Sequence, residues 1–75
     1  MFIINQDKDE LYFIQKPYVI DGKIILYDNK TYFGINLYID NVFLGTFDTI
    51  EEFMQEVYNI NNNKNNIYII NDNCG

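Results

Sequence analysis

Carboxylates are the most numerous of the side chains in this sequence that could take part in chemistry. Its 75 residues include eleven aspartates and glutamates, five lysines and one cysteine, and histidine, serine and arginine do not occur. A nucleophilic hydroxyl or thiol needs a neighbouring base, usually a histidine, to activate it. Cys74 therefore has no such base in the sequence, and we expect that the protein is not an enzyme.

Two groups of carboxylates could bind a metal ion or a partner. In the first, Asp7, Asp9 and Glu10 lie in a short charged segment, but the aspartate, glycine and distal glutamate that complete an EF-hand loop do not follow. Zinc sites are built mainly from cysteine and histidine. We therefore expect no metal ion and no other cofactor, and we interpret the first group as a solvated turn.

The second group of carboxylates, Glu51, Glu52 and Glu56, lies on a predicted helix. Thr49 and Glu52 have the spacing of a capping box, and the helix dipole favours negative charge in the first turn. No lysine lies one turn away to balance this acidic face. The face is either general surface charge that keeps the protein soluble or a contact surface for a partner.

The remaining pattern predicts an α+β fold in one domain, residues 1–75, with an antiparallel meander of four to six strands and one helix on one face. Alternating apolar residues indicate strands at 2–5, 11–15, 23–27, 31–39, 42–47 and 66–70, and residues 18–20 are predicted as the first arm of a hairpin whose partner strand is 23–27. Asp21-Gly22 and Asp40-Asn41 are predicted as tight turns. The helix, about 49–60, has one apolar stripe at helical spacing, formed by Ile50, Phe53, Met54, Val57 and Ile60.

Charge and composition narrow the possible partners. The net charge of −6 opposes direct binding to nucleic acid or to an anionic membrane. No apolar run is long enough to span a membrane, no signal peptide is evident, and one cysteine cannot form an intramolecular disulfide. We therefore expect a cytoplasmic protein. A chain of this length buries only about 60–65% of its unfolded surface, so self-association as a homodimer would add to its core.

The seven tyrosines suggest a second feature. If the strand at 31–39 turns Phe33, Ile35 and Leu37 toward the helix, then Tyr32 and Tyr38 face the opposite side. Tyr27, Tyr68 and their apolar neighbours could extend that tyrosine-bearing face. Tyrosine is enriched in protein interfaces, so the face is either an interface or a second small core covered by the N-terminal strands.

Two resemblances complete the sequence evidence. The segment from Val42 to Glu52 resembles the strand-to-helix junction of the plant ethylene-response type DNA-binding domain, which implies strands packed on a helix. The arginines and tryptophans with which that family contacts DNA are absent here, so DNA binding is not implied. The segments Ile3–Asp7 and Leu44–Thr49, with Glu51-Glu52 and Glu56-Val57, are similar to small phage and prophage proteins of low-GC Gram-positive bacteria. That resemblance implies an inhibitor of host defence, such as an anti-CRISPR protein.

We therefore expect a non-enzymatic phage-type inhibitor that binds a basic host defence protein in the bacterial cytoplasm, with carboxylates in the place of nucleic acid. Charge complementarity would give specificity and a fast on-rate, and tyrosines would supply buried contact area. The alternatives are an oligomeric protein that binds a small ligand such as a signalling nucleotide, and a self-associating structural or regulatory protein. The predicted partner-binding residues are Tyr27, Asp28, Tyr32, Tyr38, Asp40, Asp48, Glu51, Glu52 and Glu56.

Overall fold

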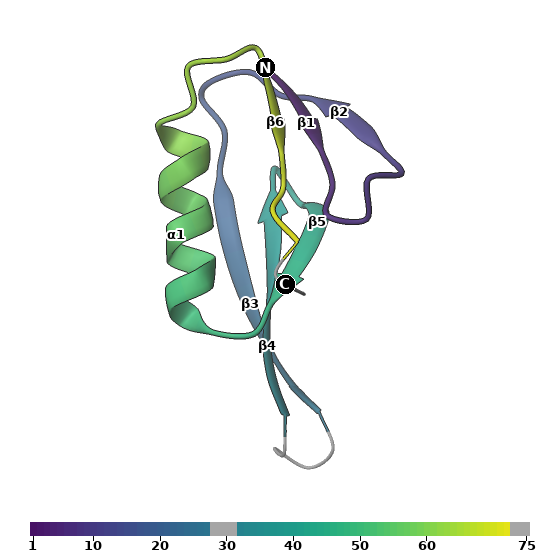
Figure 1. Ribbon diagram of the computed structural model, residues 1–75, viewed down its shortest axis with the longest axis vertical. Helices are drawn as coiled ribbons and strands as arrows, with labels where there is room; N and C mark the ends of the chain where they lie inside the picture. The colour runs from purple at the N-terminus through teal and green to yellow at the C-terminus, as the bar shows by residue number, and fades with distance from the viewer. Residues whose placement is uncertain (28–31, 73–75) are drawn as a thin grey trace.

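The computed structural model describes residues 1–27 and 32–72, and in these ranges it contains six strands and one helix (Figure 1). The predicted α+β fold is confirmed. Asp28 and Cys74 lie outside the described residues. The helix α1 is Ile50–Asn61, and the strands are β1 (Phe2–Ile4), β2 (Leu11–Phe13), β3 (Ile20–Tyr27), β4 (Tyr32–Ile39), β5 (Val42–Phe47) and β6 (Ile67–Ile69).

The strands form two three-stranded sheets. In sheet A the order is β2-β1-β6, and in sheet B it is β3-β4-β5. Sheet B is an antiparallel meander as the sequence predicts, but it contains three of the six strands where a meander of four to six was expected. In sheet A, β1 is antiparallel to β2 but parallel to β6. This parallel pair joins the beginning and the end of the described chain, and local sequence patterns contain no signal for it.

Of the two predicted turns, one is confirmed and one is wrong. Asp40 and Asn41 join β4 to β5 with φ of 49° and 68°, the positive values that a tight hairpin turn requires. Asp21 and Gly22 instead lie within β3, where Gly22 pairs with Leu37 of β4. A Cβ atom at Gly22 would lie 2.6 Å from Cζ of Phe53. Glycine leaves room here for an aromatic ring of α1, which a Cβ atom would displace.

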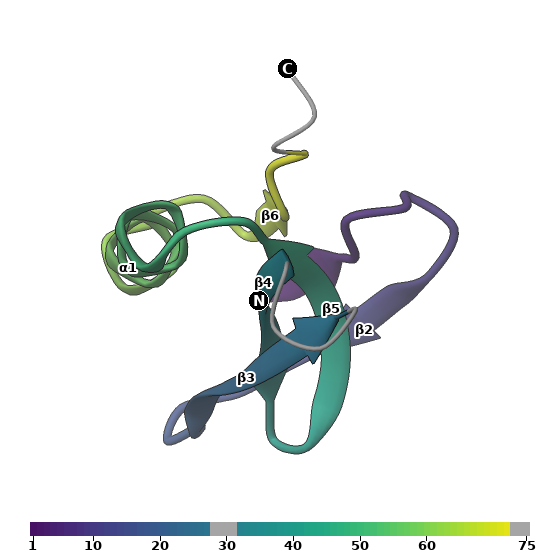
Figure 2. The same ribbon diagram turned by 90° about the horizontal axis from the view of Figure 1, so that it is seen from below.

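One hydrophobic core lies between one face of sheet B, helix α1 and the inner face of sheet A. Figure 2 shows β6 as the strand of sheet A that lies next to α1. The N-terminal strands contribute to this core and do not form a second one over the tyrosine-bearing face, because Ile3 packs in the same cluster as Leu37. The cluster of buried residues is Ile3, Ile14, Leu37, Ile39, Leu44, Phe47, Ile60 and Ile70.

The helix is rotated relative to the stripe that the sequence predicts. Ile50 and Met54 were expected to be buried, but 53% and 56% of their surfaces are exposed. The side that faces the core instead has Phe53, Glu56 and Ile60 at helical spacing. The rotation follows from sheet A, because β6 and the residues after it bond to Glu56.

Gln6 connects the two sheets. Its side-chain amide accepts a hydrogen bond from the Thr46 N–H at 2.9 Å and donates one to the Thr46 carbonyl at 2.9 Å, as a neighbouring strand would. Its backbone N–H donates to the Leu44 carbonyl at 2.8 Å. Gly45 permits this approach, since a Cβ atom there would lie 2.7 Å from Cβ of Gln6. These bonds fix sheet A against the edge of sheet B.

Candidate functional site

The most acidic concave surface lies beside the first two turns of α1. It is a shallow cleft of about 410 Å³ between the helix, the end of β5 and the residue Asn71 after β6. Three of its lining residues are glutamates and none is basic. We call this surface the acidic cleft, and the residues that line it are Phe47, Glu51, Glu52, Gln55, Glu56 and Asn71.

The beginning of the helix holds the first glutamates in place. Thr49 is the N-cap residue, and its hydroxyl oxygen accepts a hydrogen bond from the Glu52 N–H at 3.1 Å. The same hydroxyl lies 3.1 Å from Oε1 of Glu52, to which it donates. The predicted N-cap is therefore confirmed, whereas the Glu52 carboxylate accepts its bond from the Thr49 hydroxyl in place of the backbone N–H that a capping box uses. This bond holds the Glu52 carboxylate at the start of α1. Glu51 is exposed beside it.

Glu56 is buried, and the expectation that it lies on an exposed acidic face is wrong. Only 2% of its surface is exposed. Its carboxylate accepts hydrogen bonds from the Tyr68 hydroxyl at 2.6 Å, the Asn71 side-chain amide at 2.7 Å and the Asn71 N–H at 3.1 Å. A buried carboxylate must be hydrogen-bonded in this way to offset its lost hydration. Glu56 therefore attaches β6 to α1 and lines the cleft without projecting from it.

The Tyr68 hydroxyl is the neutral partner of this carboxylate. Burial raises the pKa of Tyr68 well above its usual value, and the hydrogen bond to Glu56 adds to the rise, because both oppose a second negative charge there. We expected Tyr68 to extend the tyrosine-bearing face. It instead belongs to the inner side of sheet A, because its position in β6 is set by the parallel pairing of Tyr68 with Ile3.

The net charge of the cleft is negative. Three carboxylates line it, and the donors that reach Glu56 are all neutral. The positive end of the α1 dipole is equivalent to roughly half an elementary charge, which is too small to cancel them. The cleft is therefore suited to a cationic group, and a lysine or arginine side chain of a protein partner fits this chemistry.

The predicted site residues do not form one surface. Asp48 is exposed between β5 and α1, near Glu51 and Glu52. Asp40 precedes β5 and therefore lies at its opposite end, roughly 20 Å away for a strand of this length. Its carboxylate accepts a hydrogen bond from the Val19 N–H at 3.0 Å. Asp40 is thus separate from the acidic cleft.

Tyr38 lies on the face of sheet B that points away from the core. Its ring centroid is 5.6 Å from that of Phe43, and Nζ of Lys23 lies 4.7 Å above the ring. A lysine stacked on this tyrosine reduces the negative character of the surface around it. Tyr27 and Tyr32 are paired in the β3–β4 register, but their side chains lie outside the described residues.

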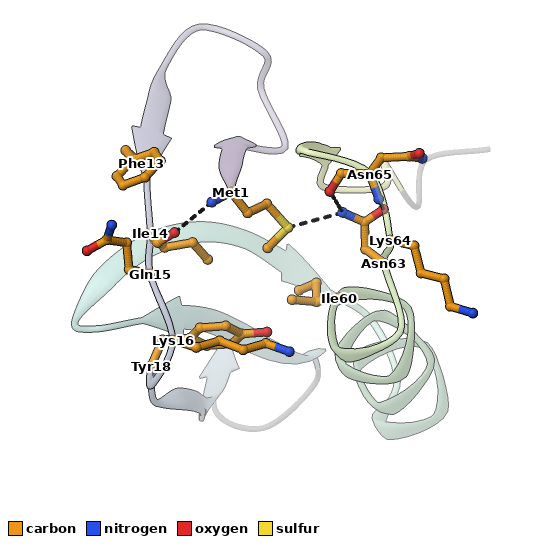
Figure 3. Close-up of a pocket in the computed structure, with 10 residues that line it drawn as sticks. All are labelled: Met1, Phe13, Ile14, Gln15, Lys16, Tyr18, Ile60, Asn63, Lys64 and Asn65. Carbon is orange, nitrogen blue, oxygen red and sulfur yellow. Dashed lines mark hydrogen bonds between the residues drawn. The ribbon is translucent and has the colours of Figure 1, made fainter.

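A second pocket, of about 330 Å³, lies between the segment after β2 and the end of α1 (Figure 3). Two lysines, Lys16 and Lys64, line it. Figure 3 shows that the Lys64 side chain extends away from Lys16, so the two ammonium groups do not converge on one point. Met1 occupies part of the space, and Nδ2 of Asn63 donates a hydrogen bond to its sulfur at 3.1 Å. The two lysines therefore do not form one convergent cationic site in this pocket.

Neither the comparisons with known proteins nor the described residues indicate a known family, a metal site or a membrane-spanning helix. No family model, no curated protein and no solved structure matches this chain. Among residues 1–27 and 32–72, no group of three or more histidine, cysteine, aspartate or glutamate side chains could hold a metal ion. In the same ranges no helix has the length and apolar character to cross a membrane. The acidic cleft is therefore the structural feature that points most directly to a function.

Proposed function

We propose that this protein acts by binding a basic surface of another protein, with a lysine or arginine side chain of that partner in the acidic cleft. The observation that supports the proposal most directly is the composition of the cleft, which has three glutamates and no basic lining residue. Glu51 and Glu52 at its rim are the contact residues, and Asp48 beside them adds to the negative potential. Glu56 has a positioning role.

The rim carboxylates favour fast and specific binding more than high affinity. Charges at the rim of an interface steer the encounter and reject partners of like charge, and salt screens them. Because the whole chain has a charge of −6, its overall field attracts a basic partner, and the cleft then selects one orientation. This behaviour is what an inhibitor needs to compete with nucleic acid for a cationic groove.

We propose further that the partner is a host defence protein and that binding blocks its nucleic-acid site without any catalytic step. The similarity of Leu44–Thr49 and the helix glutamates to small phage proteins supports this choice of partner. A small-ligand function has weaker support, since Lys16 and Lys64 do not converge in their shared pocket (Figure 3).

The proposal can be tested by affinity capture with a charge-matched control. The immobilised protein is incubated with lysate of a low-GC Gram-positive bacterium at about 50 and 500 mM salt, between which exposed charges become strongly screened, and retained proteins are identified by mass spectrometry. The double variant Glu51→Gln, Glu52→Gln removes two charges from the cleft. The control Asp7→Asn, Asp21→Asn removes two charges from exposed positions elsewhere.

We expect a basic protein to be retained by the wild type and the control at low salt, and to be lost at high salt or with the cleft variant. Equal loss in the control and the cleft variant would show that only the overall charge matters. Retention that does not depend on salt would contradict an electrostatic cleft.

A further inference from the structure

The outer face of sheet A is apolar along all three of its strands. In the register of the sheet, Phe2 pairs with Phe13 and Ile67, and Ile4 pairs with Leu11 and Ile69. Side chains that are paired across strands lie on the same side of a sheet. We call the six residues together the outer apolar face, which comprises Phe2, Ile4, Leu11, Phe13, Ile67 and Ile69.

These side chains are mostly accessible. The exposed fractions are 59% for Leu11, 56% for Phe13 and 48% for both Ile67 and Ile69, and Phe2 has 37%. Together they present roughly 500 Å² of contiguous apolar surface, which is near the upper end of what a soluble monomer exposes. The rings of Phe2 and Phe13 pack edge to face with centroids 5.1 Å apart, so the face is already ordered.

We propose that the outer apolar face is the interface of a symmetric homodimer in which two copies stack sheet A against sheet A. A two-fold contact must be complementary to itself. This face satisfies that condition because its six side chains have no charge, so no like charges meet across the axis. Two such faces together bury about 1,000 Å², the size at which specific interfaces begin.

The size of the core gives an independent reason for a second copy. Among the described residues, nine hydrophobic residues are buried, whereas thirteen large hydrophobic residues are exposed. A domain of this length is only marginally stabilised by its own core. Face-to-face packing of two sheets would give it the inner layer of a β-sandwich, with the sheets about 10 Å apart.

The dimer leaves the acidic cleft open. Successive side chains of a strand point to opposite faces, so Tyr68 points to the inner side while Ile67 and Ile69 point to the outer side. Tyr68 bonds to Glu56, which lines the cleft. The inference is therefore independent of the proposed function, and a dimer would carry two separate clefts.

A second exposed apolar group provides a matched control. Ile24, Leu26 and Phe33 lie on the β3–β4 hairpin, which extends past the start of α1 in Figure 1. Leu26 is 54% exposed, close to the value for Leu11, and both residues lie on edge strands. The substitutions Leu11→Glu and Leu26→Glu therefore change the same residue type at equal exposure on two different surfaces.

The test is sedimentation equilibrium across about 1–500 μM protein, a range that covers the affinities of small interfaces. We expect a reversible dimer for the wild type and for Leu26→Glu, with dissociation constants within about 3-fold of each other. For Leu11→Glu we expect the dissociation constant to rise by about 100-fold or more, since each copy would bury a carboxylate in an apolar interface that offers it no partner. Phe13→Glu repeats the test, and circular dichroism confirms that each variant is folded.

The dependence on salt distinguishes the proposed dimer from the proposed binding of a basic partner. Two copies of charge −6 repel each other, so about 500 mM salt should tighten the dimer, whereas it should weaken capture of a basic partner. A wild type that stays monomeric at every concentration would overturn the dimer. The proposed dimer would also be overturned if Leu26→Glu dissociated it as strongly as Leu11→Glu does. Capture of the partner by Leu11→Glu is expected to be unchanged, and its loss would count against the proposed function.

Discussion

The two sides of sheet A differ in polarity, and the difference is the opposite of what hydrophobicity alone predicts. On the inner side, β6 presents Tyr68 to a buried glutamate. On the outer side, the flanking residues Ile67 and Ile69 are both 48% exposed. A charged group is therefore stable inside when three donors reach it, while apolar groups remain outside when no described part of the chain covers them.

The largest expected effect comes from removing the carboxylate on the inner side. Glu56→Ala leaves the Tyr68 hydroxyl and both Asn71 donors without their acceptor, and breaks the connection between α1 and β6. We expect the free energy of unfolding to fall by about 3 kcal/mol, because bonds to a buried charge are strong and unpaired donors are costly. Urea denaturation of the monomer, followed by circular dichroism, measures this change.

Glu51→Ala is the control for that experiment, since it removes an exposed glutamate five residues earlier in the same helix. Its free energy of unfolding should stay within about 0.5 kcal/mol of the wild-type value. Equal losses for the two variants would show that Glu56 does not have the special role that its three hydrogen bonds imply.

The second-largest effect on stability is expected for the contact of Gln6 with β5, which holds sheet A in position against sheet B. Gln6→Ala removes two hydrogen bonds to the backbone of Thr46 and should lower the free energy of unfolding by about 2 kcal/mol. Gly45→Ala should cost about 1–3 kcal/mol, because the added Cβ atom meets the Gln6 side chain. Thermal unfolding of each variant checks both values. In the double variant part of the Gly45→Ala loss should remain, because Gln6→Ala removes the Cδ and Oε1 atoms that the added Cβ atom meets but keeps the Cβ atom 2.7 Å away.

Alkaline pH should produce a smaller effect through Tyr68. The pKa of Tyr68 is higher in the folded protein than the value of 10.0 expected for the unfolded chain. The unfolded chain therefore releases this proton first, so the stabilising contribution is complete below pH 10 and is lost as the pH rises further. We expect wild-type stability to fall more steeply above pH 10 than that of Tyr68→Phe. Parallel urea titrations between pH 8 and about 11 compare the two slopes.

The smallest effect on the free energy of unfolding is expected for a substitution on the outer side of sheet A. Leu11→Thr replaces an exposed apolar residue at an edge strand, where threonine is well tolerated. At a protein concentration low enough to keep the chain monomeric, the free energy of unfolding should change by less than about 0.5 kcal/mol. A loss of several kcal/mol in that dilute urea titration would mean that the outer apolar face is part of the core of the monomer.

The sequence predicts the elements of this fold well and their packing less well. Thr49 and the Asp40-Asn41 turn have local chemistry that fixes their structure, so the start of α1 and the β4–β5 hairpin are both predicted. Asp21-Gly22 has equally strong turn chemistry, but contact of Gly22 with Phe53 takes precedence. The turn prediction fails because that contact joins residues far apart in the sequence.

Contacts between residues far apart in the sequence also limit the prediction of the candidate site. Glu51 and Glu52 could be identified from helix capping, which depends on neighbours in the sequence. The burial of Glu56 depends on Tyr68 and Asn71, whose positions follow from the parallel pairing of β6 with β1. No pattern within a few residues of Glu56 indicates that pairing, so an acidic helix face was expected where the structure has one buried and two accessible glutamates.

The most direct test of the acidic cleft is an NMR titration of the labelled protein with a short lysine- and arginine-rich peptide. The account predicts that the largest shift changes occur at Glu51, Glu52, Gln55 and Asn71, and that they disappear in about 0.5 M salt. Changes centred instead on Asp7, Asp9 or Asp21, or spread evenly over all exposed carboxylates, would contradict the claim that this cleft selects a cationic side chain.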